Sequence, residues 1–121
     1  MDTSSLVAYL DGSRGSDVDA VHAALAEHQA VLPPVVLTEI LSDPALPQAV
    51  RTLLTELPLL DLEPGFWERA GSLRASVLKQ RRKARVADAL IAQACLDQSV
   101  PLVTRDKDFR NLAAAAGLAL L

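Results

Sequence analysis

Residues 86–104 read VADALIAQACLDQSVPLVT and join an amphipathic helix to a short apolar strand. The apolar residues of the helical part recur at the spacing i, i+3, i+4, i+7 and i+8: Ala87, Leu90, Ile91, Ala94 and Cys95. Residues 100–104 form an apolar run that is too short for a helix and is typical of a buried strand. A helix that leads directly into a buried strand indicates an α/β domain with a mainly parallel sheet.

The same alternation continues through the rest of the chain. Helices are predicted at residues 17–28, 35–42, 66–77 and 109–116, and further strands at residues 30–33, 57–62 and 118–121. Gly117 follows the last helix as a left-handed cap. The chain of 121 residues has the length of one domain, so we expect residues 1–121 to form a single α/β domain.

The composition excludes several classes of protein. Only four residues are aromatic, which argues against folds that stack nucleic-acid bases on rings. The single cysteine, Cys95, excludes a disulfide framework and a cysteine-based zinc site, and it fits a reducing cytoplasm. The longest apolar run, residues 112–121, is about half of a membrane span, so we expect neither secretion nor membrane insertion. The net charge of −3 means that an anionic substrate requires a bound cation or a local basic patch.

Two acidic residues interrupt apolar helix faces. Asp88 lies at the edge of a buried stripe near a helix start, where an unpaired carboxylate is costly to bury. Glu39 lies in VVLTEIL, a short helix that is apolar nearly all round. Asp88 could instead cap the first helical turn, and Glu39 could lie partly exposed at a seam between helices.

Three more carboxylates lie near predicted strand or helix ends. Asp106 and Asp108 follow the strand at residues 100–103, in TRDKDF, and one of them could cap the next helix. Asp2 could likewise cap a helix that starts near Ser4. Because reactive groups gather beyond the carboxyl ends of parallel strands, we expect these carboxylates and Glu39 and Asp88 to converge at one sheet edge.

These residues resemble the motifs of the PIN-domain ribonucleases, and among them the VapC-type toxins of bacterial toxin–antitoxin pairs. The resemblance covers essentially the whole chain and is carried by Asp2-Thr-Ser, by Glu39 in VVLTEIL, by Asp88 in VADALIA and by TRDKDF at residues 104–109. It implies a five-stranded parallel sheet between helices, RNA cleavage with Mg²⁺ or Mn²⁺, a homodimer, and a VapB-type antitoxin that occupies the acidic groove.

The resemblance also assigns site residues. Asp2, Glu39, Asp88 and Asp106 take the metal-site positions, and the supporting positions fall on Ser4, Thr104 and Asp108. The family pattern runs an apolar strand into the first aspartate, whereas here only Met1 precedes Asp2. We therefore expect Asp2 to be held less firmly than the other carboxylates.

The residue types favour magnesium or manganese over zinc. Two carboxylates about 4 Å apart repel by roughly 4 kcal/mol at an effective dielectric near 20, and a divalent cation removes that conflict. Oxygen-only ligands suit Mg²⁺ or Mn²⁺. We expect Asp2, Asp88 and Asp106 to bind the ion directly or through water, and Glu39 to bind it or to position the attacking water.

The segment KQRRKAR at residues 79–85 carries five positive charges just before Asp88. It could be a solvated helix end whose cations complement the helix dipole, or a patch in which Arg81, Arg82 and Arg85 grip RNA phosphates. Two rival functions stay open. One is a PIN-like binding or regulatory module with little or no catalysis, and the other is a magnesium-dependent phosphatase suggested by Asp-Lys-Asp at residues 106–108.

Overall fold

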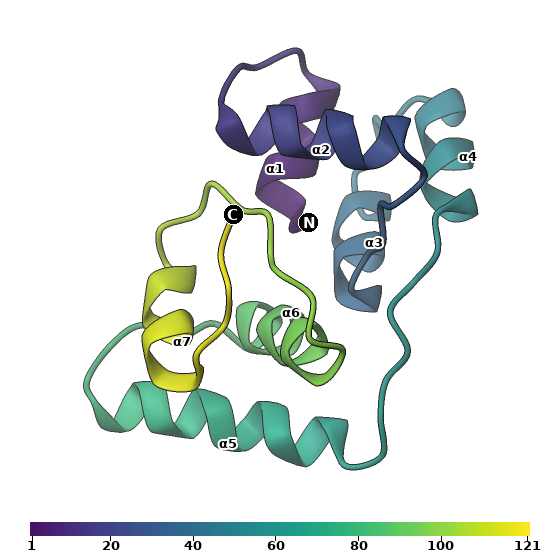
Figure 1. The fold of residues 1–121 in the computed structure, drawn as a ribbon. Coiled ribbons are helices and arrows are strands. Elements are labelled where there is room, and N and C mark those ends of the chain that lie inside the picture. The colour runs from purple at the N-terminus through teal and green to yellow at the C-terminus, as the bar shows by residue number, and fades with distance from the viewer.

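A computed structural model describes residues 1–121 and contains seven α-helices (Figure 1). They are α1 (Thr3–Leu10), α2 (Ser16–Ala26), α3 (Pro34–Leu41), α4 (Gln48–Glu56), α5 (Phe66–Lys79), α6 (Val86–Asp97) and α7 (Phe109–Ala116). The helices predicted from apolar spacing are thus present as α2, α3, α5, α6 and α7. No helix is both long and apolar enough to cross a membrane.

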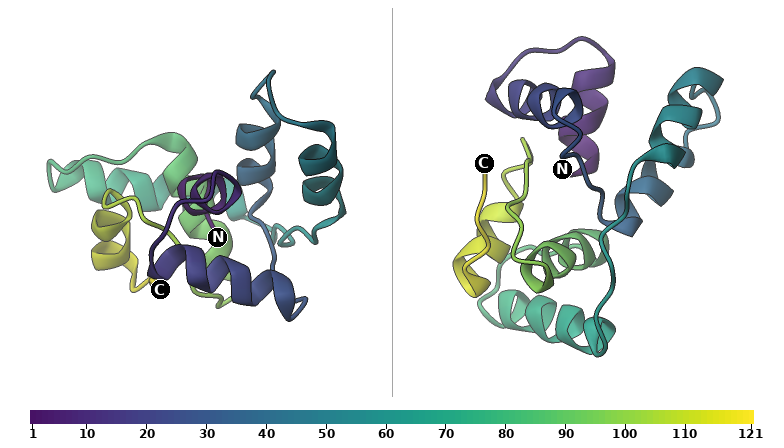
Figure 2. Two further views of the ribbon diagram at one scale, coloured as in Figure 1. Left: turned by 90° about the horizontal axis from the view of Figure 1, so that it is seen from above. Right: turned by 45° about the vertical axis from the view of Figure 1, so that its right-hand side comes forward.

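The helices form two groups that meet in the middle of the molecule. Helices α5, α6 and α7 pack against one another, and α1 packs against α2 and α3 (Figure 1). The contact of α3 with α6 joins the two groups, and the N-terminus lies between them, whereas the C-terminus lies on the side of α7 (Figure 2). The start of the chain, the start of α6 and the loop before α7 are therefore brought into one region.

Local signals explain where the helices begin, end and face the core. The α5 face predicted from spacing is buried throughout: Phe66, Ala70, Leu73 and Val77. Gly117 ends α7 at φ 72°, a left-handed conformation that suits glycine. In α6 the buried face is shifted from the predicted stripe, because Ala89 and Ala92 are buried whereas Ala87 and Leu90 are only half-buried.

The predicted parallel five-stranded sheet is wrong: the structure contains no sheet. The segments expected as strands make only two isolated parallel bridges, Leu32 with Leu59 and Leu102 with Leu120. One further backbone hydrogen bond, from Asp2 N–H to the Val103 carbonyl at 3.0 Å, ties the chain start to one of these segments. Short extended segments thus lie side by side in the predicted parallel direction without building a ladder.

Proline and the closeness of helix ends explain why no ladder forms. Leu32 is followed by Pro33 and Pro34, and α3 begins at once, so the segment ends after a single bridge. Pro58 and Pro101 each stand directly before a bridging leucine. Proline has no N–H to donate, so a strand that contains it loses a hydrogen bond to its neighbour.

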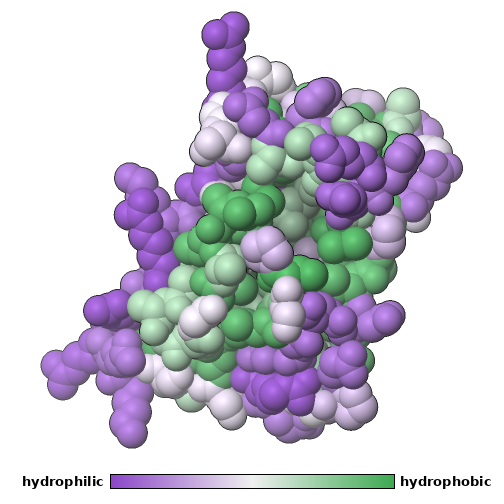
Figure 3. All heavy atoms as spheres, viewed as in Figure 1, coloured by the Kyte–Doolittle hydropathy of each residue, from purple (hydrophilic) through white to green (hydrophobic).

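The apolar core is continuous across both helix groups. It includes the largest fully buried side chains, among them Phe109, Leu6, Leu32, Ile91 and Leu102. On the face seen in Figure 3, hydrophobic residues gather across the middle, between hydrophilic residues at the upper and lower ends. The exposed leucines of the extended segments are Leu59, Leu62, Leu120 and Leu121, as expected where segment edges lack partners.

Candidate metal centre

Asp88 is held in the first turn of α6 without a hydrogen-bond partner. Its residue is half-buried, but its Oδ2 atom is buried and unpaired. The α6 N-terminus has no side-chain cap, so the alternative that Asp88 caps the helix is not what the structure shows. A buried carboxylate oxygen without a donor is costly, and a cation or a proton would relieve that cost.

Three carboxylates form one cluster at this point. Single oxygen atoms of Asp88, Asp106 and Asp108 all lie within 4.8 Å of one another. Asp106 Oδ1 accepts a hydrogen bond from the Asp108 N–H at 2.9 Å, which fixes the turn before α7. Asp108 stands at the N-cap position of α7, yet its side chain makes no capping hydrogen bond. The turn therefore presents both carboxylates toward Asp88.

Electrostatics within the cluster disfavour a third negative charge. Burial, and next the charge of Asp106, raise the pKa of the Asp88 carboxyl to about 6, with smaller contributions from Glu39 and Asp108. Arg85 opposes this shift but does not cancel it. Without a cation, Asp88 would therefore take up a proton far more readily than an ordinary aspartate does.

The basic segment reaches the cluster through one lysine. Lys83 Nζ lies 3.4 Å from Asp108 Oδ2, and the Lys83 carbonyl accepts a hydrogen bond from Asn111 at 3.3 Å. Arg81, Arg82 and Arg85 are exposed and make no ion pair. The segment thus lies beside the carboxylates with three free cationic side chains.

Asp2 is the most enclosed of the predicted site residues. It caps α1 by accepting the Ser5 N–H at 3.0 Å, and both of its oxygens accept the Ser4 hydroxyl at 2.9 Å. Thr104 Oγ1 donates to Asp2 Oδ2 at 2.5 Å. With an exposed fraction of 3% and four hydrogen bonds, Asp2 is firmly held, so the expectation of a loose Asp2 is wrong.

Thr104 links the Asp2 side of the site to the acidic cluster. Its hydroxyl donates to Asp2 and accepts the Asp106 N–H at 3.0 Å. Glu39 is exposed on α3 and accepts the Thr3 hydroxyl at 2.7 Å. Asp2 and Glu39 both lie outside the group of three carboxylates. The structure therefore joins Asp88, Asp106 and Asp108 directly and places Asp2 and Glu39 at the periphery.

Sequence reasoning missed one ion pair next to this site. Asp17 accepts hydrogen bonds from Arg105 Nε at 2.8 Å and from Arg105 Nη2 at 3.2 Å. Asp17 stands in the first turn of α2, where an acidic residue is ordinary, so its type and position give no functional signal. Arg105 separates Thr104 from Asp106, and that adjacency is the one hint the sequence contains.

The donor set fits a hard divalent cation. Three carboxylates, with a hydroxyl close by and no histidine or cysteine among them, are the ligand chemistry of Mg²⁺ or Mn²⁺. Cys95 lies in the core, and burial raises the pKa of its thiol to about 11, so it remains protonated. The unpaired Asp88 oxygen is the group that such an ion would satisfy.

The comparison with protein families agrees with this site. Residues 1–115 match the PIN domain, so the chain belongs to the PIN-domain family. PIN domains are generally metal-dependent nucleases, and the acidic cluster is a group able to hold such a metal. No curated protein matches the chain.

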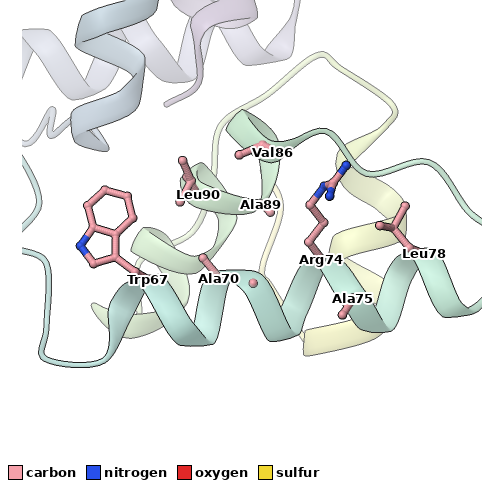
Figure 4. Close-up of a pocket in the computed structure, with 9 residues that line it drawn as sticks. Trp67, Ala70, Arg74, Ala75, Leu78, Val86, Ala89 and Leu90 are labelled. Carbon is pink, nitrogen blue, oxygen red and sulfur yellow. The ribbon is translucent and has the colours of Figure 1, made fainter.

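Several concave surfaces lie outside the cluster, and two of them concern the elements around the site. An apolar groove of about 420 Å³ runs between α5 and α6, lined among others by Trp67, Arg74, Val86 and Leu90 (Figure 4). A smaller hollow of about 270 Å³ lies between α1, α3 and α4. The second includes Thr3 and Glu39, so it adjoins the peripheral side of the site.

Proposed function

We propose that this PIN-domain protein is a Mg²⁺- or Mn²⁺-dependent endoribonuclease toxin of the VapC type that hydrolyses RNA phosphodiester bonds. The proposal is carried by the acidic cluster, in which Asp88 has a buried, unpaired Oδ2 and one carboxylate oxygen of each of Asp88, Asp106 and Asp108 lies within 4.8 Å of the others. A fold does not retain such an oxygen for stability, because it raises the free energy of the folded state unless a cation binds.

The role proposed for each carboxylate follows from whether its oxygens already accept hydrogen bonds. Asp88 and Asp106 would hold the ion, with Asp108 close enough to share it. Asp2 would contribute through water, because its oxygens already accept the Ser4, Ser5 and Thr104 donors. Glu39 would orient the attacking water from the exposed edge, while Ser4 and Thr104 keep Asp2 in place.

The bound ion would supply Lewis acidity and charge compensation for attack of water on the phosphodiester. The chain's own carboxylates would hold the ion and orient the attacking water. The basic segment would bind the flanking phosphates, which an acidic protein otherwise repels. Its free arginines Arg81, Arg82 and Arg85 lie on the same stretch as Lys83, which contacts the cluster.

RNA cleavage by the purified full chain tests the activity. We expect cleavage with Mg²⁺ or Mn²⁺, none with a chelator, and a loss of at least about a hundredfold for Asp88→Asn, since the lost charge stabilisation is worth several kcal/mol. Asp61→Asn is the matched control, because Asp61 is exposed and its side chain has no partner. Equal cleavage by Asp88→Asn would reject the metal-site assignment, and hydrolysis of a phosphomonoester alone would favour a phosphatase.

RNA binding by the basic segment is tested separately from RNA cleavage. Substituting Arg81 and Arg82 by glutamine should reduce the slope of log binding constant against log salt by about 1.4, that is, roughly 0.7 for each lost contact with single-stranded RNA. Binding is measured with the inactive Asp88→Asn chain as background. An unchanged slope would show that these arginines are only a solvated helix end.

A VapB-type antitoxin is the partner that the hollow beside Glu39 suits best. Among the residues that line this hollow, Val7, Leu10 and Ile40 are apolar, and Asp11, Glu39 and Asp43 are acidic. This arrangement is complementary to an amphipathic segment with leucine on one face and arginine on the other. A synthetic Leu/Arg helix should bind and should inhibit cleavage, and Asp43→Lys should abolish both effects. If Asp43→Lys binds the helix as tightly as the wild type does, this hollow is not the antitoxin site.

We also propose that the protein is a homodimer, as the VapC resemblance implies. A dimer has twice the chain mass of 12.9 kDa. Light scattering during size exclusion should give that doubled mass at micromolar concentration. A single-chain mass would reject the dimer and leave the nuclease proposal intact.

A further inference from the structure

A second polar cluster joins α2 to the loop before α7 that carries Asp106. Asp17 is its centre, and its side chain is only 10% exposed. It accepts two hydrogen bonds from Arg105 and one from the Ser5 hydroxyl at 2.9 Å. Arg105 Nη2 also donates to the Arg14 carbonyl at 3.0 Å. The hydrogen bonds of the Asp17 and Arg105 side chains are therefore made within this cluster and not with Asp88, Asp106 or Asp108.

The cluster is connected to the site at two points along the chain. Ser5, which is completely buried, donates its N–H to Asp2 and its hydroxyl to Asp17. Arg105 stands between Thr104, which binds Asp2, and Asp106, which belongs to the acidic cluster. The Asp17–Arg105 ion pair thus ties the turn that carries Asp106 to α2, and Ser5 continues the connection to Asp2 at the start of α1.

The backbone around Asp17 is shaped to admit this pair. Gly15 has φ 149°, and a Cβ there would lie 2.6 Å from Asp17 Oδ1 and 3.2 Å from Arg105 Nη2. No other residue fits this position without displacing the carboxylate. Hydrogen bonds from Arg105, which have the largest effect, and from Ser5 lower the pKa of the Asp17 carboxyl to about 2. The Asp17–Arg105 pair therefore stays charged at neutral pH.

The guanidinium of Arg105 is engaged away from the carboxylates of the site. It makes no ion pair with Asp2, Asp106 or Asp108, because both of its bonding nitrogens point to Asp17 and Arg14. It would therefore affect ion binding through the position of the turn and not by competing as a cation. Planar, two-point contact of this kind restricts orientation as well as distance.

We propose that Arg105, held by Asp17, which Ser5 in turn supports, is a positioning residue that sets Asp106 against Asp88 for divalent-cation binding. The inference deepens the proposed function and depends on it. Partners that orient metal ligands without touching the metal typically change affinity by about ten- to a hundredfold when they are removed. The same range is expected for the loss of the Asp17–Arg105 pair.

Mn²⁺ binding to the full chain, followed by calorimetry and by the electron spin resonance of free Mn²⁺, tests this role. Arg105→Gln and Asp17→Asn should each raise the Mn²⁺ dissociation constant by about tenfold or more. The double variant should be no weaker than the weaker single variant, since both remove one interaction. Arg105→Lys, which keeps the charge but not the two-point contact, should fall between the wild type and Arg105→Gln.

A matched ion pair elsewhere in the molecule supplies the control. Arg69 binds Asp97 through Nε at 3.1 Å and Nη2 at 2.6 Å, and it joins α5 to α6. The arginine side chains are 40% exposed in this pair and 37% in the Asp17 pair, and each aspartate is 10% exposed. Arg69→Gln should lower the melting temperature and leave the Mn²⁺ dissociation constant unchanged.

The outcomes distinguish a failure of the positioning role from a failure of the proposed nuclease function. If Arg105→Gln binds Mn²⁺ within twofold of the wild type, or if Arg69→Gln weakens binding equally, the positioning role is rejected while the nuclease proposal stands. If the wild type itself binds no Mn²⁺, both are rejected. Should Arg105→Gln fail to fold, Ser5→Ala removes a single hydrogen bond of the cluster and is expected to weaken Mn²⁺ binding in the same direction.

Discussion

The Asp2 side and the Asp88 side of the site use the same functional group in opposite ways. Asp2 accepts hydrogen bonds from Ser4, Ser5 and Thr104, so its charge is stabilised by the protein itself. Asp88 faces other carboxylates and has a buried oxygen with no donor. The difference teaches that one carboxylate holds the site together, whereas the other is available to a ligand at a cost in stability.

The largest expected effect separates the two sides by ion binding. An ion that binds only the folded wild type should add about 2.7 kcal/mol of stability at a hundredfold excess over its dissociation constant. Asp88→Asn should abolish this gain, and its metal-free form should melt above the metal-free wild type because an unpaired buried charge is gone. Thermal melting with and without Mn²⁺ measures both. A full Mn²⁺ gain in Asp88→Asn would remove the distinction between the two carboxylates.

The next effect tests whether Asp2 is structural. Asp2→Ala should lower the free energy of unfolding by about 2 kcal/mol, roughly half from the lost helix cap and half from the unpaired hydroxyl groups. Asp108→Ala is the control, because Asp108 occupies the same cap position of α7 without a capping bond. Urea unfolding of metal-free Asp108→Ala should show little or no loss in the free energy of unfolding. Equal losses would contradict the special role of Asp2.

The third effect is a pH dependence that belongs to the Asp88 side alone. The folded pKa of about 6 lies above the ordinary aspartate value of 3.8, so the folded chain holds this proton more tightly than the unfolded chain. The stabilising contribution is complete below about pH 4 and is lost as the pH rises to about 6. Urea midpoints of the chelated wild type should therefore fall across this window. In Asp88→Asn the urea midpoint should not fall across this window. A fall that persists in this variant would belong to another titrating group.

The smallest effect concerns the exposed ion pair at the edge of the cluster. Lys83→Gln should change the free energy of unfolding by less than about 1 kcal/mol, because the Lys83 side chain is 58% exposed. Mn²⁺ should bind slightly more tightly, since Lys83 no longer competes for Asp108. Calorimetric titration measures this difference, with Lys107→Gln as a control on an exposed lysine that makes no ion pair. Weaker Mn²⁺ binding would show that Lys83 supports the cluster.

The elements of the chain differ in how far their sequence predicts them. The buried face of α5 and the end of α7 at Gly117 follow from local spacing and backbone preference, and both predictions are confirmed. The sheet prediction is wrong, because apolar runs such as residues 30–33 and 57–62 meet the requirements of a strand only if neighbours continue the ladder. Prolines at residues 33, 58 and 101 limit this pairing to single bridges.

The site shows the same division. Asp88 is identifiable from its apolar surroundings and Asp106 from its place after a predicted strand, and the two do meet. That Asp108 joins them while Glu39 stays at the edge depends on how the turn before α7 approaches α6. The same holds for Asp17, whose partner Arg105 lies far along the chain. Such contacts leave no periodic signal in the sequence.

The sequence by itself determined helices α2, α3, α5, α6 and α7, the end of α7 at Gly117 and the set of candidate carboxylates, because these depend on hydrogen bonds and side-chain spacing within about one helical turn. Only the tertiary structure decided that the extended segments form no sheet, that Asp2 is saturated with donors and that Asp88 is left without one. The physical reason is distance along the chain: partners such as Asp2 and Thr104 meet only after the two helix groups pack together.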